Sequence, residues 1–166
     1  MKISNTQPGS LKLQISPTRR IADMLTVWFE PGPEVDMVMD VRYGLKMRPR
    51  SVKALYLFHL LGNLDPEKTQ SVVDSCYAAV EPGGDINFIE TDFDYITRAA
   101  VGGDLTPEQF SKEFTRKNYV TLQTMLRLLT NTGIPQNQQV LWNDPTVFNF
   151  TREHHELVVT GRRSNV

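Results

Sequence analysis

Several acidic side chains and one histidine stand at or just after runs of sequence that are typical of β-strands. A histidine with an ordinary pKa of about 6.5 can remove a proton near neutral pH, and a carboxylate can accept hydrogen bonds from hydroxyl or amino groups. Such side chains predict proton transfer, or the binding of a polar ligand, at the ends of strands. They are Glu30, Asp40, His59, Asp92 and Asp94.

The runs that precede these side chains have the periodicity of strands. Apolar and polar residues alternate over 11–16, and the long apolar run 52–61 is typical of a strand buried on both faces. The expected strands cover 11–16, 25–29, 35–41, 52–61, 85–91, 138–142, 146–151 and 155–163. Helices are expected to begin at Asp65-Pro66, at Thr106-Pro107 with Gln109 completing a capping box, and at Thr121.

This order of elements predicts an α/β fold. A strand, a helix and a strand in succession indicate a parallel pair with a right-handed crossover, whereas the last two strands are expected to form an antiparallel hairpin. We therefore expect a Rossmann-like, mostly parallel sheet with antiparallel C-terminal strands. Ligands of such sheets bind outside the carboxyl ends of the strands, where the strand order reverses. There the fold would gather Ser16, Glu30, Asp40, His59, Asp92 and Asp94.

Composition predicts a single globular domain over 11–166, after a flexible N-terminal arm over 1–10. The chain has 166 residues, of which 40% are hydrophobic and 22% charged, so it can bury a sizeable core. The formal net charge is -1, from 18 basic and 19 acidic residues, which gives no strong signal for nucleic acid. The short basic cluster of Arg48, Arg50 and Lys53 is interpreted as a solvated loop.

The sequence favours a cytoplasmic location. Its single cysteine, Cys76, suits a reducing compartment and, on the apolar stripe of a helix, is expected to be a packed thiol. No apolar run approaches the roughly 18 residues that a membrane span needs, and the first ten residues lack the apolar core of a signal peptide. His154 and His155 have no third ligand at metal-binding spacing, so no metal is expected.

Three stretches resemble the class I S-adenosylmethionine-dependent methyltransferases. That family has an acid-ended strand, a segment near HVLEH, a helix, and then LKPGG before the next strand. This chain has VDMVMDV at 35–41, HLLGN at 59–63 and VEPGG at 80–84 in matching places. The late helix 122–134 and the terminal strand 155–163 also resemble the family, so the resemblance covers roughly residues 11–163, with 35–94 the most specific part.

The resemblance implies a protein that binds S-adenosylmethionine and transfers its methyl group to an acceptor, small or macromolecular, that the sequence does not identify. In the family an acid near Asp40 accepts from the adenine amino group, and the acid that ends the second strand holds the ribose hydroxyls. His59 or Asp92 would then act as the base. The cofactor-binding residues implied in this way are Ser16, Glu30, Asp40, Val41 and His59.

The chain departs from the family where the cofactor should bind. Ser16-Pro17 stands in place of the glycine-rich turn, and either Trp28 or Glu30 falls where the ribose acid is expected. Gly62 and Asn63 replace the acid and the second histidine of HVLEH. About ten residues separate the first two strands, which is short for a crossover with a helix. The alternative is therefore an inactive module that has lost tight cofactor binding and acts through a protein partner or as a homo-oligomer.

Each candidate residue also has a structural interpretation. Asp40 can be a solvated acid paired with Arg42, and Trp28 a core residue rather than a platform for adenine. His59 can be hydrogen-bonded inside the core. Asp94 is interpreted as an acid at the start of the next helix, and Asp92 is left open between that role and catalysis.

Two further segments have expected roles. Gly83-Gly84 is expected to form a tight turn between a helix and a strand, with at least one residue at positive φ. The segment 95–120 follows the fifth strand, and its position predicts a lid or a platform for the acceptor.

Overall fold

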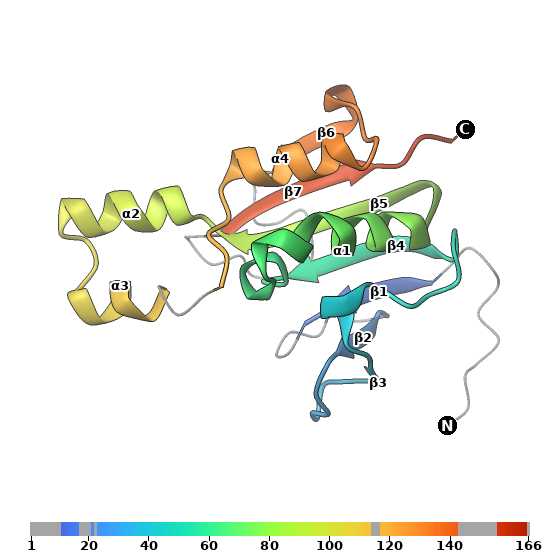
Figure 1. Ribbon diagram of the computed structural model, residues 1–166, viewed down its shortest axis with the longest axis horizontal. Helices are drawn as coiled ribbons and strands as arrows, with labels where there is room; N and C mark the ends of the chain where they lie inside the picture. Colours follow the sequence, from blue (N-terminus) through green and yellow to red (C-terminus); the bar gives the residue numbers. More distant parts are fainter. Residues whose placement is uncertain (1–10, 17–20, 22, 114–116, 143–155, 166) are drawn as a thin grey trace.

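A mixed β-sheet forms the centre of the molecule (Figure 1). The computed structural model describes residues 11–16, 21, 23–113, 117–142 and 156–165. Within these residues the strands form one seven-stranded sheet in the order β3-β2-β1-β4-β5-β7-β6. The strands are β1 (Lys12–Ile15), β2 (Leu25–Trp28), β3 (Met37–Val38), β4 (Val52–Phe58), β5 (Val80–Thr91), β6 (Gln139–Trp142) and β7 (Glu156–Arg162).

The expected strand directions are confirmed. The strands β1 to β5 pair in parallel, whereas β7 runs antiparallel to both of its neighbours, β5 and β6. The sheet is thus mostly parallel with antiparallel C-terminal strands. The expected strand over 146–151 and the expected arm over 1–10 lie outside the described residues.

The helices begin where the sequence places their caps. They are α1 (Pro66–Ala79), α2 (Phe93–Gly102), α3 (Pro107–Glu113) and α4 (Leu122–Asn131). The capping box of α3 is present, because Thr106 N–H donates to Gln109 Oε1 at 2.8 Å and Gln109 N–H donates to Thr106 Oγ1 at 3.2 Å. Gly133 follows α4 with a φ of 97°, a backbone conformation that favours glycine. At α1, Asp65 takes the N-cap position without a capping hydrogen bond, and its carboxylate instead contacts Lys68 and Lys117.

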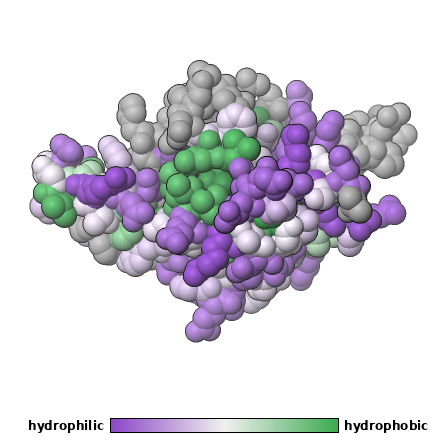
Figure 2. Space-filling view, turned by 90° about the horizontal axis from the view of Figure 1, so that it is seen from above, coloured by the Kyte–Doolittle hydropathy of each residue, from purple (hydrophilic) through white to green (hydrophobic). Residues whose placement is uncertain are grey.

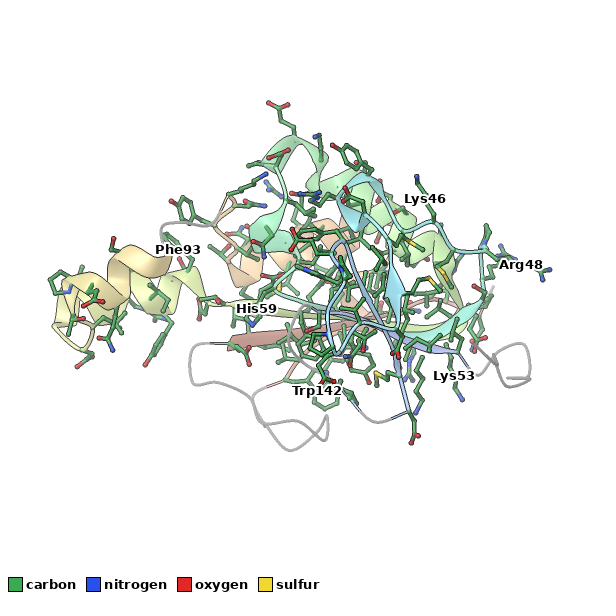
Figure 3. The ribbon with its side chains drawn as sticks, turned by 90° about the horizontal axis from the view of Figure 1, so that it is seen from below. Lys46, Arg48, Lys53, His59, Phe93 and Trp142 are labelled. Atoms are coloured by element: carbon green, nitrogen blue, oxygen red, sulfur yellow. The ribbon has the colours of Figure 1, made fainter. Side chains whose placement is uncertain are left out.

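The sheet carries a core on each face. Helices α1 and α4 lie on the same face (Figure 1), over buried strand residues such as Leu13, Leu55 and Phe88. The other face has a smaller apolar cluster of Ile21, Phe58, Ile89 and Val158, with Trp142 packed against it. Figure 3 shows Trp142 on the side of the sheet away from α1.

Polar side chains interrupt this second face, and they are satisfied locally. Gln14 donates to Thr26 Oγ1 at 2.9 Å, and Thr160 receives a 2.7 Å hydrogen bond from Trp142 Nε1. Thr160 in turn donates to Asn87 Oδ1 at 2.6 Å. Because buried polar groups are costly unless they are hydrogen-bonded, this network allows a polar row to lie inside the sheet.

Three strand boundaries differ from the expected ones by several residues. The strand expected over 35–41 is reduced to β3, because Asp40 caps a short 3-10 helix, Val41–Tyr43. The strand expected over 52–61 ends at Phe58, because His59 adopts a φ of 50° that breaks the extended backbone. The fifth strand begins at Val80 rather than 85.

Residues 81–84 form an irregularity in β5 rather than a separate turn. Val52 pairs with Val80 and Ala54 pairs with Asp85. The residues 81–84 of β5 therefore lie opposite a single residue of β4. Gly83 has a φ of 77°, as expected for the turn. At Gly84 an added Cβ would lie 2.6 Å from the carbonyl oxygen of Lys53, which leaves no room for a side chain.

The crossover between β1 and β2 is unusually short. The strands are parallel, with Leu13 opposite Leu25, yet residues 16–24 alone connect them. The described residues of this connection are not helical. Parallel neighbours are normally joined by a dozen or more residues that include a helix. The sequence expectation of a shortened first crossover is therefore confirmed.

Candidate functional site

The candidate residues line one edge of the sheet. Since β1 to β5 are parallel, their carboxyl ends share that edge, which faces α2 in Figure 1. Following the strand order, the row runs Asp40, Glu30, Ser16, His59 and Asp92. Neighbouring strands are about 4.8 Å apart, so the tips of β3 and β5 are roughly 19 Å from each other. The ends of the row therefore cannot act on one small group, although a long ligand could span them.

Asp40 is bound by a neighbour in the chain. Arg42 donates from Nε to Asp40 Oδ1 and from Nη2 to Oδ2, both at 2.8 Å, in the bidentate geometry of a guanidinium and a carboxylate. The Arg42 N–H also donates to Asp40 Oδ1 at 3.2 Å. The guanidinium carbon lies 4.3 Å from the centre of the Phe29 ring, within the range of a cation–π contact. Arg42 is thus held between a carboxylate and an aromatic face.

This pairing sets the electrostatics of the β2 and β3 tips. The hydrogen bond from Arg42 lowers the pKa of the Asp40 carboxyl, and the same bond raises the pKa of Arg42. Glu30 is exposed, and its charge contributes to the raised pKa of Arg42. The predicted pairing of Asp40 with Arg42 is confirmed.

The backbone beside these acids is also engaged. Val41 is fully buried, and its N–H donates to the carbonyl of Met39 at 2.9 Å. Ser16 is buried as well, and its N–H donates to the carbonyl of Val27 at 3.2 Å. The turn that follows, residues 17–20, lies outside the described residues.

Trp28 is a core residue at the end of β2. Its side chain is buried, and its ring centre lies 4.5 Å from that of Phe29. In the register that places Trp28 at the ribose position, an indole stands where a carboxylate would be needed. The structural interpretation of Trp28 is confirmed.

His59 is tied to the start of β7. Its Nε2 lies 2.8 Å from Oε1 of Glu156, whose side chain is fully buried. Its Nδ1 is buried too, with no hydrogen-bond partner among the described residues. The His59 N–H donates to the Ile89 carbonyl, and its own carbonyl accepts from Asn63 Nδ2 at 2.7 Å. The imidazole is thus positioned by contacts across β4, β5 and β7.

A second buried carboxylate belongs to Glu90, near the end of β5. Glu90 is 1% exposed, and its Oε1 accepts from the Leu61 N–H at 2.7 Å. Its Oε2 is 3.4 Å from the N–H of Gly62, one of the residues that depart from the family pattern. Glu90 therefore fixes the 3-10 helix Leu61–Asn63 against β5.

Asp92 caps α2. Its Oδ1 accepts from the Tyr95 N–H at 3.1 Å, which satisfies one of the free amides at the helix start. Asp94 lies exposed in the first turn, as expected for an acid at the positive end of the helix dipole. Asp92 thus has the structural role that the sequence left open, and a catalytic role for it stays a prediction.

Some cavities lined by described residues lie near this edge of the sheet, and others lie elsewhere. A small one beside β5 is lined by Gly62, Glu90, Thr91, Phe93, Asn118, Tyr119 and Val120. Another, of about 400 Å³, opens beside β6 and β7, where Trp142 and Arg162 contribute to its wall. The basic residues Lys46, Arg48 and Lys53 lie at the opposite end of the sheet from His59 and Phe93 (Figure 3).

Two kinds of site are not found in the described part of the chain. Along those residues no group of three or more His, Cys, Asp or Glu side chains could hold a metal ion. None of the described helices is long and apolar enough to cross a membrane. Cys76 is fully buried, and burial raises the pKa of its thiol to about 12, so it is a packed thiol as expected.

Sequence reasoning missed Glu90 and Glu156 as site residues. Each acid lies directly beside apolar residues of a strand sequence, INFIET or HELVV, which is a weak signal that the carboxylate has a buried partner. That partner could not be named, because Glu156 is 97 residues from His59 in the sequence.

Solved structures resemble this chain, although no family model and no curated protein matches it in sequence. A SAM-dependent methyltransferase from Methanosarcina mazei is 11% identical, with a TM-score of 0.62, and the match covers 96% of this chain and 94% of that one. A putative methyltransferase of Haloferax volcanii, solved in complex with the Trm112 methyltransferase activator, is 9% identical with a TM-score of 0.59, over 96% and 84% of the two chains. The methyltransferase SibL is 19% identical to this chain, with a TM-score of 0.51, and the match covers 36% of SibL.

At these identities the likeness establishes the fold. The chain has the Rossmann-like methyltransferase fold, with its mostly parallel sheet and antiparallel C-terminal strands.

Proposed function

We propose that this chain is a non-catalytic module with a methyltransferase fold, which does not bind S-adenosylmethionine tightly and acts by contact with another protein chain. The observation that carries the proposal is the internal use of the candidate residues. Asp40 is clamped by Arg42, and His59 is bound to a buried carboxylate, Glu156. Side chains that would bind or deprotonate a ligand therefore already have partners within the chain.

The residues at the strand tips do not fit the cofactor. Its ribose needs a carboxylate at the end of β2, where Trp28 is buried and Glu30 points to solvent. Its adenine needs an acceptor near Asp40, where the guanidinium of Arg42 already lies against both carboxylate oxygens. The N–H of Val41 is likewise bound, to Met39. Together these features support a retained scaffold without tight cofactor binding.

Calorimetry of the full chain with S-adenosylmethionine and S-adenosylhomocysteine tests this proposal. We expect no saturable heat with either ligand at ~1 mM, a concentration that would detect binding stronger than about -4 kcal/mol. A dissociation constant near the micromolar range, about -8 kcal/mol, that is lost in Asp40→Ala would overturn it.

The partner surface that we propose is the outer side of β6. Apolar side chains gather at the surface on the side of β6 and α4 (Figure 2), and β6 exposes Val140 at 44% and Leu141 at 38%. Among the described residues β6 pairs with β7 alone. One structural neighbour was solved with an activator protein, which is consistent with partner binding on this fold.

A charge placed in this surface should interfere with the contact. We expect the average mass of the wild-type chain in sedimentation equilibrium to rise with concentration, and that of Leu141→Glu to stay monomeric, because a carboxylate would be desolvated in the interface. Val101→Glu is the matched control, since Val101 is 86% exposed on α2, far from β6 in Figure 1. If both variants associate like the wild type, β6 is not a contact between copies.

The second candidate is an active methyltransferase that uses the same edge. The likeness to SAM-dependent methyltransferases and the position of His59 and Asp92 at strand tips favour it. In that case the roles of His59 or Asp92 as base, and of the segment 95–120 as a platform for the acceptor, stay predictions. The calorimetry above separates the two candidates, since an active enzyme must bind the cofactor.

A further inference from the structure

We propose that Arg42 acts as a built-in ligand: its guanidinium occupies a site, formed by the Phe29 ring and the Asp40 carboxylate, that would otherwise accept the adenine ring of a nucleoside. The inference deepens the proposed function, on which it rests, by naming the group that closes the crevice. It concerns a single side chain and can be tested by removing it.

The site has two recognition elements for a flat, nitrogen-bearing group. The Asp40 carboxylate presents two oxygens in one plane, and the Arg42 side chain donates an N–H to each at 2.8 Å. The Phe29 ring presents an aromatic face, 4.3 Å from the guanidinium carbon. A carboxylate beside an aromatic face selects a planar group that donates in its plane and stacks through its face.

An adenine ring has both properties. Its exocyclic amino group donates in the ring plane, and its bicyclic face can stack on an aromatic side chain, as bases do in nucleic-acid complexes. The guanidinium of Arg42 offers the same combination and adds a positive charge. It therefore occupies this site in preference to a free adenine ring. Because Arg42 lies two residues after Asp40, the effective concentration of its guanidinium at the site is high.

The site is open to the solvent on one side. The side chains of Arg42 and Asp40 are 41% and 37% exposed, so a ligand could reach the Phe29 ring once the guanidinium is removed. The charged groups that act on the pair are Glu30, which attracts Arg42, and Lys46, which acts on Asp40. Neither provides a planar donor that could replace Arg42, because Glu30 only accepts hydrogen bonds and the ammonium of Lys46 is not planar.

The test compares adenosine binding by three chains: the wild type, Arg42→Ala, and Arg42→Ala combined with Asp40→Ala. Adenosine is the probe because it isolates the base and the ribose from the rest of the cofactor. We expect Arg42→Ala to bind adenosine about tenfold more tightly than the wild type, in the millimolar range, and the double variant to lose this gain. Guanidinium chloride at a few times the adenosine concentration should displace the nucleoside from Arg42→Ala, since it restores the missing group.

Equal affinity of the wild type and a folded Arg42→Ala would overturn the inference, as would a gain that persists in the double variant. If Arg42→Ala fails to fold, NMR of the wild-type chain tests the contact between Arg42 and Phe29 instead. Its Arg42 Nε–H should give a resolved NMR signal with cross-peaks to the Phe29 ring protons, and their absence would refute the contact. Failure of the proposed function is a separate result, because it appears as tight binding of S-adenosylhomocysteine to the wild-type chain.

Discussion

At the scale of single residues, the side chains that could do chemistry are engaged with partners in the chain. Asp40 and His59 have the residue types and the strand-end positions that a ligand site needs. Their neighbours decide what they do: Arg42 binds both oxygens of Asp40, and Glu156 binds His59 Nε2. Residue type therefore identified the edge of the sheet, whereas the partners of these side chains are known only from the structure.

The titration of Asp40 should report its bond to Arg42. We expect the pKa of the Asp40 carboxyl to lie below its ordinary value of 3.8 in the wild type, and to rise in Arg42→Ala, which lacks the lowering hydrogen bond. Because the pKa is depressed in the folded chain, the pair stabilises the fold above the ordinary pKa, and this contribution is lost as the pH falls through the folded value. NMR titration of the Asp40 side-chain carbon measures both pKa values.

Phe29→Leu is the control for this titration, since it keeps Arg42 and removes only the ring below it. The pKa of Asp40 should stay low in that variant. An Asp40 pKa that is the same with and without Arg42 would show that the ion pair does not form in solution.

The bond between His59 and Glu156 should contribute to stability. Glu156→Ala removes the acceptor for His59 Nε2 inside the protein, and we expect the free energy of unfolding to fall by about 1–3 kcal/mol. Glu156→Gln keeps an oxygen in the same place and should lose about 1 kcal/mol or less. Urea unfolding measures both changes. Equal losses in the two variants would contradict this account, because Gln keeps both the size and an oxygen acceptor and should therefore be the milder change.

At the scale of elements, the residue that follows β7, Arg163, holds the end of α1. Arg163 donates from Nη1 to the carbonyls of Tyr77 at 2.8 Å and Val80 at 2.7 Å, and its guanidinium lies 4.5 Å from the centre of the Tyr77 ring. The last carbonyls of a helix lack partners within it, and a cation at this end is also favoured by the helix dipole. This contact links the C-terminal strand to the helix between β4 and β5.

Replacing Arg163 should therefore destabilise the fold more than replacing its neighbour. We expect Arg163→Ala to lower the free energy of unfolding by about 1–2 kcal/mol, because carbonyls at the end of α1 lose charged donors. Arg162→Ala is the matched control: Arg162 is 66% exposed and pairs with Asp85, so its loss should cost about 0–1 kcal/mol. Chemical denaturation compares the two, and an equal or larger loss for Arg162→Ala would contradict this account of α1.

Local sequence signals predicted helix boundaries, but they did not predict where β3 and β4 end. The capping box of Thr106 and Gln109 and the terminator Gly133 set helix boundaries through contacts a few residues apart, which periodicity and residue type can reveal. The ends of β3 and β4 depend instead on Asp40 turning back to cap a 3-10 helix and on His59 at positive φ. Neither conformation has a signal in residue type alone.

At the scale of the whole molecule, the chain is a methyltransferase fold with shortened N-terminal crossovers. The mostly parallel sheet and its antiparallel C-terminal strands followed from the order of elements and the resemblance, whereas the strand order comes from the structure. The partners of His59 and Glu90 did not, because they bring together residues 97 and 29 positions apart. Long-range pairing of this kind is set by the packed sheet, and the sequence pattern of either strand does not encode it.

The segment after β5 also differs from a lid in its placement. Helices α2 and α3 project away from the sheet as an arm (Figure 1), and within the described side chains of α2 only Ile96 and Ala99 are buried. The position after the fifth strand suggested a role at the crevice. The arm leaves the β5 tip and extends outward, so an acceptor platform in this segment stays a prediction.

The central claim is that the strand tips are closed by the chain's own side chains. A titration of the wild-type chain with S-adenosylhomocysteine, followed through the backbone amide NMR signals, tests it most directly. The account predicts that the amides of Val41, His59 and Leu60 keep their positions up to ~1 mM ligand. Saturable shifts of these amides with a micromolar midpoint would contradict it and would establish a working cofactor site at this edge.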